Sequence, residues 1–262
     1  MRPGPAAGAL ASPPLPHPML PIDEPPLSAE LIGARHGALM ARLRLAAEEA
    51  GRDPDGFRVV AITKGFELPV VRAARVAGLT RFGENRVQEA LPKVAAVPDA
   101  EWHLVGRLQA NKARPAARAF AVIHSVDSLD LLRRLEWIAA EEGVAPSVLL
   151  QVNVSGEAGK AGFEMAWAQD QARRRADLLT SLDRLAAIRV VGLMTIGPTG
   201  AVFEAARAVF AALRQLRDAL QQLGGRPLPE LSMGMTADAA AAVAEGATLV
   251  RIGTALFGPR PG

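Results

Sequence analysis

Short apolar segments alternate with longer segments of helical periodicity along most of the chain. Eight short apolar segments have the length of strands: 59–64, 81–84, 102–105, 121–125, 147–152, 189–194, 230–233 and 248–252. The first of them is apolar enough for burial on both faces. Between most of them lie alanine- or leucine-rich segments of helical pattern, such as 69–77, 129–142, 202–223 and 237–245. Strands that alternate with helices predict a parallel sheet and an α/β fold.

Eight such repeats predict a closed (β/α)8 barrel of the TIM type, which typically needs about 250 residues. A doubly wound open sheet is the alternative, because a strand count from sequence is easily wrong by one. An additional N-terminal helix is predicted over 28–51, where Leu31, Met40, Leu43 and Ala47 follow helical spacing and Gly51 ends the pattern. No linker rich in proline or glycine interrupts residues 28–262, so they are expected to form one domain.

The first 27 residues are expected to form a disordered, proline-rich tail. Residues 1–26 hold nine of the 20 prolines and lack the hydrophobic segment of a signal peptide. The whole chain is 50% hydrophobic and 22% charged, so the rest of it has enough apolar residues for a sizeable core.

The charge distribution, the apolar runs and the cysteine content bear on the binding of nucleic acid, on membrane insertion and on the cellular compartment. The formal net charge is +3, and the basic residues are spread along the chain. The densest basic run, Arg173 to Arg175, fits a solvated helix face better than a nucleic-acid site. Charges or prolines interrupt every long apolar run, so no membrane span is expected. The absence of cysteine fits a reducing compartment, and we expect a cytoplasmic protein.

Lys64 stands at the end of the first predicted strand, where the active sites of such barrels lie. Only four of the 30 basic residues are lysines, so arginine serves wherever charge alone is needed. A desolvated lysine can lose its proton and attack a carbonyl carbon, whereas arginine stays charged. Lys64 is therefore a candidate for a Schiff base with a carbonyl ligand, and an ordinary charge at the barrel rim is the alternative.

The last two predicted strands carry features of a phosphate site. Arg251 lies in an apolar strand, so its guanidinium is expected to point into the barrel and to find a polar partner. Gly253 and Thr254 follow it, and the segment "SMGMT" from Ser232 to Thr236 ends the neighbouring strand. Phosphate commonly binds between strands seven and eight of this barrel. Together with Lys64, these residues suggest a ligand with a phosphate and a carbonyl group.

Several motifs in combination resemble a known family. The segments "AITKGF", "RFGENRVQEA", "EWHLVGRLQANK", "IHSVDS", "LLQVNVSGEAGKAGF", "GLMTI" and "LSMGMTADAAAAVAEGATLVRIGTALFG" are similar to those of the pyridoxal 5′-phosphate homeostasis proteins. That family resembles the N-terminal barrel of alanine racemases without their second domain. The resemblance spans about residues 28–258 and implies a protein that binds pyridoxal phosphate, stores and delivers it, and maintains vitamin B6 homeostasis.

By this resemblance, Lys64 carries pyridoxal phosphate covalently, as an internal aldimine. The other implied contacts are with the phosphate (Ser232, Gly253 and Thr254), the pyridine nitrogen (Arg251) and the ring pocket (Asn85 and Met194). The segment after Lys64 reads "TKGFELP", where the family more often has "SKTKP". Contacts of that loop are therefore expected to differ from the family pattern.

Three functions fit these residues: a non-catalytic carrier of pyridoxal phosphate, a weak racemase-type enzyme and a Schiff-base aldolase. Arg251 would disfavour protonation of the pyridine nitrogen, on which most pyridoxal-phosphate catalysis relies. The chain also contains no tyrosine to act as the second base of a racemase. His103 or His124 is the alternative base, although hydrogen bonding to backbone at the rim is the preferred interpretation. We favour the carrier, with apo forms of pyridoxal-phosphate enzymes as recipients, and expect neither catalytic residues nor a metal site.

Lys160 lies in a glycine-rich segment, "NVSGEAGKAGF", after the fifth predicted strand. Glycine favours backbone freedom, so this segment is expected to be a mobile loop at the rim rather than packed structure. Its amine is a candidate acceptor for the cofactor during release, and a solvated surface charge is the alternative.

Overall fold

The structure of the chain, a computed structural model, describes residues 27–157, 159–164, 172–198, 200 and 203–260. In the helix that begins at residue 172, side chains are described from residue 177 onward. The predicted tail therefore lies outside the described residues except for Leu27, which packs against the hydrophobic core. The side chains of Arg173 to Arg175 also lie outside this description.

Eight parallel strands form a closed barrel, which confirms the predicted (β/α)8 architecture. Neighbouring strands follow the order β4-β3-β2-β1-β9-β8-β7-β5, and pairing between β4 and β5 closes the ring. A ninth, two-residue strand, β6, pairs with β5 and was not predicted. The strands span Arg58–Ile62 (β1), Arg81–Glu84 (β2), Glu101–Leu104 (β3), Val122–Val126 (β4), Ser147–Asn153 (β5), Phe163–Glu164 (β6), Arg189–Met194 (β7), Glu230–Met235 (β8) and Leu249–Ile252 (β9).

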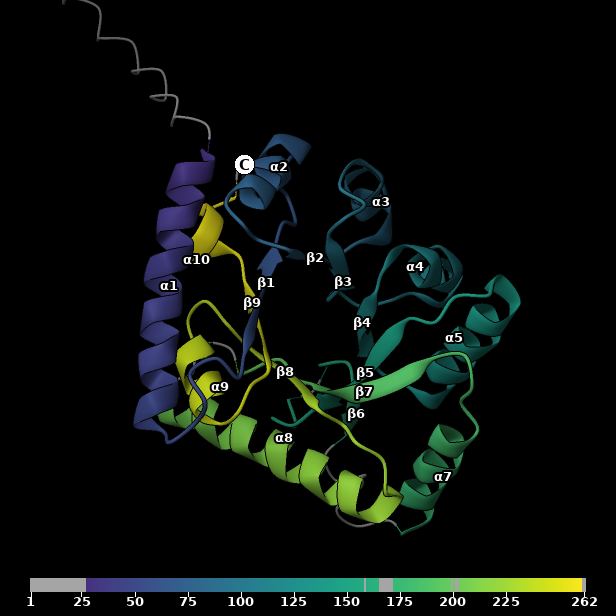
Figure 1. Cartoon of the computed structure of the whole chain (residues 1–262). Helices are drawn as coiled ribbons and strands as arrows, with labels where there is room; N and C mark the ends of the chain where they lie inside the picture. The colour runs from purple at the N-terminus through teal and green to yellow at the C-terminus, as the bar shows by residue number, and fades with distance from the viewer. Residues whose placement is uncertain (1–26, 158, 165–171, 199, 201–202, 261–262) are drawn as a thin grey trace, which may run out of the picture.

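Helices surround the barrel (Figure 1). The Ser28 and Ser128 hydroxyls each accept a hydrogen bond from the backbone three residues on, and these caps begin α1 and α5. Gly143, with a φ of 65°, ends α5 in the left-handed conformation that glycine favours. The helices span Ala29–Glu49 (α1), Leu68–Val76 (α2), Val87–Ala96 (α3), Ala113–Ala119 (α4), Leu129–Glu142 (α5), Ala172–Asp183 (α7), Phe203–Gly224 (α8), Ala239–Ala244 (α9) and Thr254–Phe257 (α10), and a 3-10 turn spans Ala110–Lys112.

The N-terminal helix α1 covers one side of the barrel, where it packs against α2, α9 and α10 (Figure 1). Its buried residues, Ile32, Leu39, Leu43 and Ala47, follow one another at spacings of seven, four and four positions and so form one stripe. None of the described helices combines the length and the apolar character needed to cross a membrane.

Two separate hydrophobic clusters occupy the two faces of the barrel wall. The large one lies between strands and helices, where the fully buried Phe82 contacts the ring of Trp102 at 5.3 Å between centroids. The small one consists of Val60, Ile62 and Leu249, with Val105 packed against it. Since alternate residues of a strand face opposite sides, this small cluster fills the lumen. Apolar packing therefore fills only part of the interior.

The strands β7 and β8 approach each other closely at Gly192. A Cβ atom added there would lie 1.8 Å from the Glu230 carbonyl oxygen, and Gly192 and Glu230 are partners in the strand register. Because the contact is with backbone, it cannot be relieved by rotation of a side chain. Glycine is therefore required for the barrel to close at this position.

We expect Gly192→Ala to lower the free energy of unfolding by about 3 kcal/mol, the upper part of the usual range for overpacking. Gly37→Ala is the matched control, because a Cβ added at Gly37 in α1 meets nothing within 4 Å. It should raise the stability by about 0.5–1 kcal/mol, since alanine favours the helix interior. Urea unfolding followed by circular dichroism measures both. Equal midpoints for Gly192→Ala and the wild type would contradict the close approach.

Candidate functional site

The predicted site residues come from the carboxyl ends of β1, β2, β7, β8 and β9. These ends lie at one rim of the barrel because all of these strands are parallel. Ala61 on β1 pairs with Ile252 on β9, so Lys64 and Thr254 follow the ends of neighbouring strands. Met194 on β7 is the register partner of Ser232 on β8. The fold therefore brings the predicted residues to one end of the barrel.

Lys64 lies in a tight turn after β1. The Phe66 N–H donates to the Thr63 carbonyl oxygen at 3.1 Å, and Gly65 has a φ of 75°, which glycine adopts without steric cost. Lys64 itself is half-buried. Burial lowers the pKa of its ammonium group, the charge of Arg260 lowers it further, and Glu84 acts in the opposite direction. A larger fraction of this amine is therefore neutral than for an ordinary surface lysine.

A buried polar cluster fixes the end of β1 just before Lys64. Lys93, on α3, donates from Nζ to the Thr63 carbonyl oxygen at 2.9 Å and to Glu84 Oε1 at 2.7 Å. The Thr63 hydroxyl donates to the same carboxylate oxygen at 2.7 Å. The Thr63 carbonyl belongs to the peptide bond that leads into Lys64, so the cluster holds this bond in place. Apart from the rarity of lysine in the chain, nothing in the sequence pattern points to Lys93.

Arg251 extends from β9 into the barrel interior, as expected for a cation in an apolar strand. Its Nη1 donates to the Ser232 hydroxyl at 2.7 Å, and its Nη2 donates to the Thr195 carbonyl oxygen at 2.9 Å. The residue is only 5% exposed. Burial lowers the pKa of the guanidinium to about 10, and Asp238 opposes this effect. Arg251 therefore remains a cation at neutral pH, and the prediction that it points inward to polar partners is confirmed.

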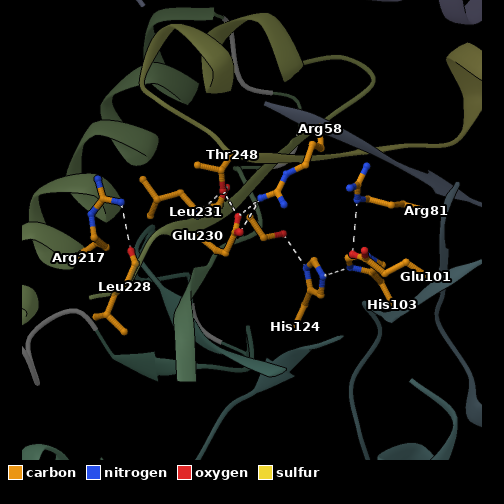
Figure 2. A network of polar contacts seen from close by, with 11 residues as sticks. Arg58, Arg81, Glu101, His103, His124, Arg217, Leu228, Glu230, Leu231 and Thr248 are labelled. Carbon is orange, nitrogen blue, oxygen red and sulfur yellow. Dashed lines mark hydrogen bonds and ion pairs between the residues drawn. The ribbon is translucent and has the colours of Figure 1, made fainter. Parts of the chain in front are cut away.

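The histidines are in the barrel interior, so the interpretation that they bond to backbone at the rim is wrong. His103 Nδ1 lies 2.8 Å from His124 Nε2, and His103 Nε2 lies 2.8 Å from Glu101 Oε1 (Figure 2). Alternation along β3 places Glu101 and His103 on the same face of the strand. Burial lowers the pKa of both imidazoles; Glu101 opposes this effect at His103, and the charge of Arg251 adds to it at His124.

Ser232 belongs to this interior set of contacts. Its hydroxyl is fully buried and lies 2.8 Å from His124 Nδ1, besides accepting from Arg251. The phosphate role of Ser232 stays a prediction. Thr236 places a hydroxyl nearer to the Gly253–Thr254 segment, because its Oγ1 accepts from the Ala255 N–H at 3.4 Å. The sequence motif contains Thr236, but only the fold shows which of the two hydroxyls lies at the rim.

Asn85 follows β2 and lines a cavity of about 250 Å³ together with Gly106, Gln151, Asn153, Lys160 and Ile196, among others. A Cβ atom added at Gly106 would lie 2.2 Å from the Asn85 carbonyl oxygen, so this close approach requires glycine. Met194, by contrast, is 1% exposed at the end of β7. Asn85 is therefore accessible from the rim, whereas Met194 contributes to the floor.

In its described residues, 154–157 and 159–164, the glycine-rich segment with Lys160 is half-buried or exposed and makes several hydrogen bonds, and its mobility stays a prediction. Gln151 Nε2 donates to the Ala161 carbonyl oxygen at 2.9 Å, and β6 pairs with the end of β5. Lys160 Nζ donates to Glu157 Oε1 at 2.7 Å and to the Gly197 carbonyl oxygen at 3.2 Å. This lysine is thus held beside the cavity that Asn85 lines.

A larger cavity, of about 550 Å³, lies beside α5 and does not include the predicted site residues. Its lining includes Arg107, Gln109, Asp127, Asp130 and Arg134. The reactive amine and the buried guanidinium lie elsewhere, so we place the functional site at the strand ends rather than in the larger space.

Known proteins resemble this chain over most of its length. Residues 36–261 match the family described as "Alanine racemase, N-terminal domain". The pyridoxal phosphate homeostasis protein of Pseudomonas aeruginosa is 46% identical over 84% of this chain and 92% of its own length. The protein of that name from Synechocystis is 40% identical over 79% of this chain and 93% of its own length.

A solved structure gives the same result. The structure of PipY from Synechococcus elongatus PCC7942 with PLP bound superimposes with a TM-score of 0.74 at 40% identity, over 87% of this chain and 100% of PipY. The motifs, the barrel and these similarities agree with one another. The chain belongs to the alanine racemase N-terminal domain family and, within it, to the pyridoxal phosphate homeostasis proteins.

Proposed function

We propose that this protein binds pyridoxal 5′-phosphate covalently through Lys64, stores it and delivers it to other proteins. The observation that carries the proposal is a half-buried lysine of lowered pKa at the same barrel end as a buried guanidinium. The names of the curated relatives and the PLP bound to PipY support the same ligand. Vitamin B6 homeostasis in the cytoplasm follows as the cellular role.

The residues at the strand ends fit the chemical groups of this cofactor. Pyridoxal phosphate carries three groups that a binding site can recognise: an aldehyde, an anionic phosphate and a pyridine nitrogen. The aldehyde is the group that condenses with an amine. Lys64 provides the amine, and the lowered pKa increases the fraction that can attack a carbonyl carbon. The cluster around Lys93 and Glu84 holds the peptide bond before Lys64 and so restricts where the amine can reach.

Phosphate and pyridine contacts are assigned to the other strand ends. The backbone N–H groups of Gly253 and Thr254 begin α10 and suit phosphate oxygens, as does the Thr236 hydroxyl. Arg251 is assigned to the pyridine nitrogen, where a cation disfavours protonation. Asn85 and Met194 line the ring pocket. The Ser232 hydroxyl contacts Arg251 and His124. We therefore propose Thr236 for the phosphate in place of the Ser232 that the sequence resemblance implied.

A carrier fits these residues better than a racemase. A two-base racemase needs a base on each face of the substrate, and the sequence contains no tyrosine to act as the second base. His103 and His124 are buried and contact each other, so neither presents a ring nitrogen at the rim. Apo forms of pyridoxal-phosphate enzymes are the proposed recipients. A colourless protein that is inactivated by a phosphorylated sugar and borohydride would instead favour an aldolase.

Lys64→Ala is expected to abolish the covalent bond while the fold is retained, because the side chain ends in the mouth rather than the core. The absorption spectrum after mixing with pyridoxal phosphate should lose the band seen with the wild type. Borohydride reduction followed by peptide mapping should label Lys64 in the wild type. Lys112→Ala serves as the control lysine and should keep the band. A label on another lysine would contradict the assignment.

The rate of covalent binding should rise with pH through a pKa below that of an ordinary lysine, because only the neutral amine attacks. Arg260→Gln removes one cause of the lowered pKa, so the pKa should rise and the rate profile should move to higher pH. Stopped-flow absorbance across pH 6–10 measures this shift. Arg44→Gln, on α1, is the control that should leave the profile unchanged. An unchanged profile for Arg260→Gln would refute the electrostatic contribution.

Lys160→Ala is expected to slow delivery of the cofactor to an apo-enzyme without a marked change in equilibrium binding. Lys160 lines the same cavity as Asn85, and we propose that the cofactor leaves the protein through this cavity. Reactivation of an apo-enzyme by the loaded protein measures the transfer. Arg44→Ala, on α1 and outside the lining of this cavity, is the control for loss of a surface cation. Equal transfer rates for Lys160→Ala and the wild type would show that Lys160 takes no part in delivery of the cofactor.

A further inference from the structure

A continuous series of buried side-chain contacts links Arg251 to the amino-terminal end of β3. It runs from the guanidinium to Ser232, then to His124, His103 and Glu101, with successive distances of 2.7, 2.8, 2.8 and 2.8 Å. Figure 2 shows the section that includes His124, His103 and Glu101. The five residues lie on four different strands, β9, β8, β4 and β3, so only the closed barrel brings them together.

The chemistry of the two ends fixes the direction of every hydrogen bond in the series. Arginine has donors only, so the Ser232 oxygen must accept from Arg251. The single hydroxyl proton of Ser232 is then free to be donated to His124 Nδ1. Each buried imidazole holds a single proton, in line with its lowered pKa, so His124 carries its proton on Nε2 and donates it to His103 Nδ1.

The final link obeys the same rule. With Nδ1 acting as an acceptor, His103 carries its proton on Nε2 and donates it to the Glu101 carboxylate. Glu101 is suited to accept it, because the hydrogen bond from His103 lowers the pKa of its carboxyl group. Each of the four hydrogen bonds therefore joins one donor to one acceptor. Both imidazoles are neutral and carry their proton on Nε2.

The arrangement also compensates a buried charge. Arg251 donates hydrogen bonds to a hydroxyl and a carbonyl oxygen, and neither of these groups carries a negative charge. The carboxylate that ends the series is partly exposed, at the far end of the lumen. Aligned hydrogen bonds in a low-dielectric interior polarise one another, so the series orients its dipoles toward the guanidinium.

We propose that Glu101, His103 and His124 are positioning residues that hold the Arg251 guanidinium in one orientation through this one-way hydrogen-bond series. The proposal rests on the assignment of Arg251 to the pyridine nitrogen for its effect on the cofactor. None of the three residues touches the cofactor. They act through Ser232, which supplies the acceptor for Arg251 and cannot rotate while His124 takes its proton.

The tautomers of the histidines test the direction of the series without any cofactor. The sequence has four histidines, so nitrogen-15-labelled histidine gives a spectrum simple enough to assign with single substitutions. Long-range proton–nitrogen correlation at pH 7.5 should show His103 and His124 protonated on Nε2 alone. A proton on Nδ1 of either ring, or on both nitrogens, would overturn the proposal.

His103→Leu tests whether the series positions Arg251. It removes the acceptor for His124 Nε2–H, so His124 should populate both tautomers and the Arg251 side-chain N–H groups should exchange faster with solvent. The bound cofactor should dissociate about two- to tenfold faster, the effect of losing one net hydrogen bond. His36→Leu, on the outer helix α1, is the matched control and should change none of these three readouts.

A purely structural role would lower the melting temperature of His103→Leu but leave the His124 tautomer, the Arg251 exchange and the dissociation rate unchanged. That result would refute positioning. If His103→Leu does not fold, Glu101→Ala at the partly exposed end replaces it, and Glu101→Gln, which keeps an acceptor oxygen, should restore wild-type values. Failure of the wild type to bind pyridoxal phosphate would sink the proposed function alone, because the tautomers are measured in the free protein.

Discussion

A guanidinium enclosed in the barrel lumen is the constraint on which the interior depends. Arg251 cannot be solvated there, so polar partners must meet it inside the protein. Ser232 and Thr195 provide the direct contacts, and the histidines extend the polar region across the lumen. Apolar packing by Val60, Ile62 and Leu249 fills a separate part. The lumen is therefore divided between an apolar part and a polar part, unlike the mostly aliphatic interior typical of this fold.

A second buried charge lies on the outer side of the wall and serves the neighbouring strand end. Lys93 and Glu84 form an ion pair at 2.7 Å, with side-chain exposures of 10% and 0%. Such a pair stabilises little relative to apolar residues of the same volume, but loss of one partner typically costs about 3–5 kcal/mol. Its geometric effect is more direct, because both partners hold Thr63. The position of Lys64 is thus tied to α3 as well as to the sheet.

The strands were predictable because a parallel strand buried on both faces is a continuous apolar run. The predicted limits of β1, 59–64, differ from the observed Arg58–Ile62 by at most two residues, and the helix 129–142 is observed unchanged. The predicted strands were therefore accurate enough to place Lys64 and Arg251 at the carboxyl ends of their strands. The brief pairing of β6 gave no such signal, because it depends on contact with β5 rather than on its own two residues.

Side-chain partners across the barrel were not predictable from the sequence. The contact between His124 and Ser232 joins residues 108 positions apart, and it depends on how the strands are staggered around the ring. The same holds for the choice between Ser232 and Thr236, which share one motif but lie at different depths. The role of Lys93 could not be predicted, because its partners lie at the ends of two strands that only the fold brings beside α3.

The position of α1 has a consequence for synthesis on the ribosome. Its apolar stripe packs against α9 and α10, which lie far along the chain from it, at 239–244 and 254–257. At about 5–20 residues per second, the stripe stays without these partners for many seconds after it emerges. Closure of the barrel also waits for β9, since β1 pairs with it. The nascent chain thus has to keep its first helix from associating elsewhere until its final strand is released.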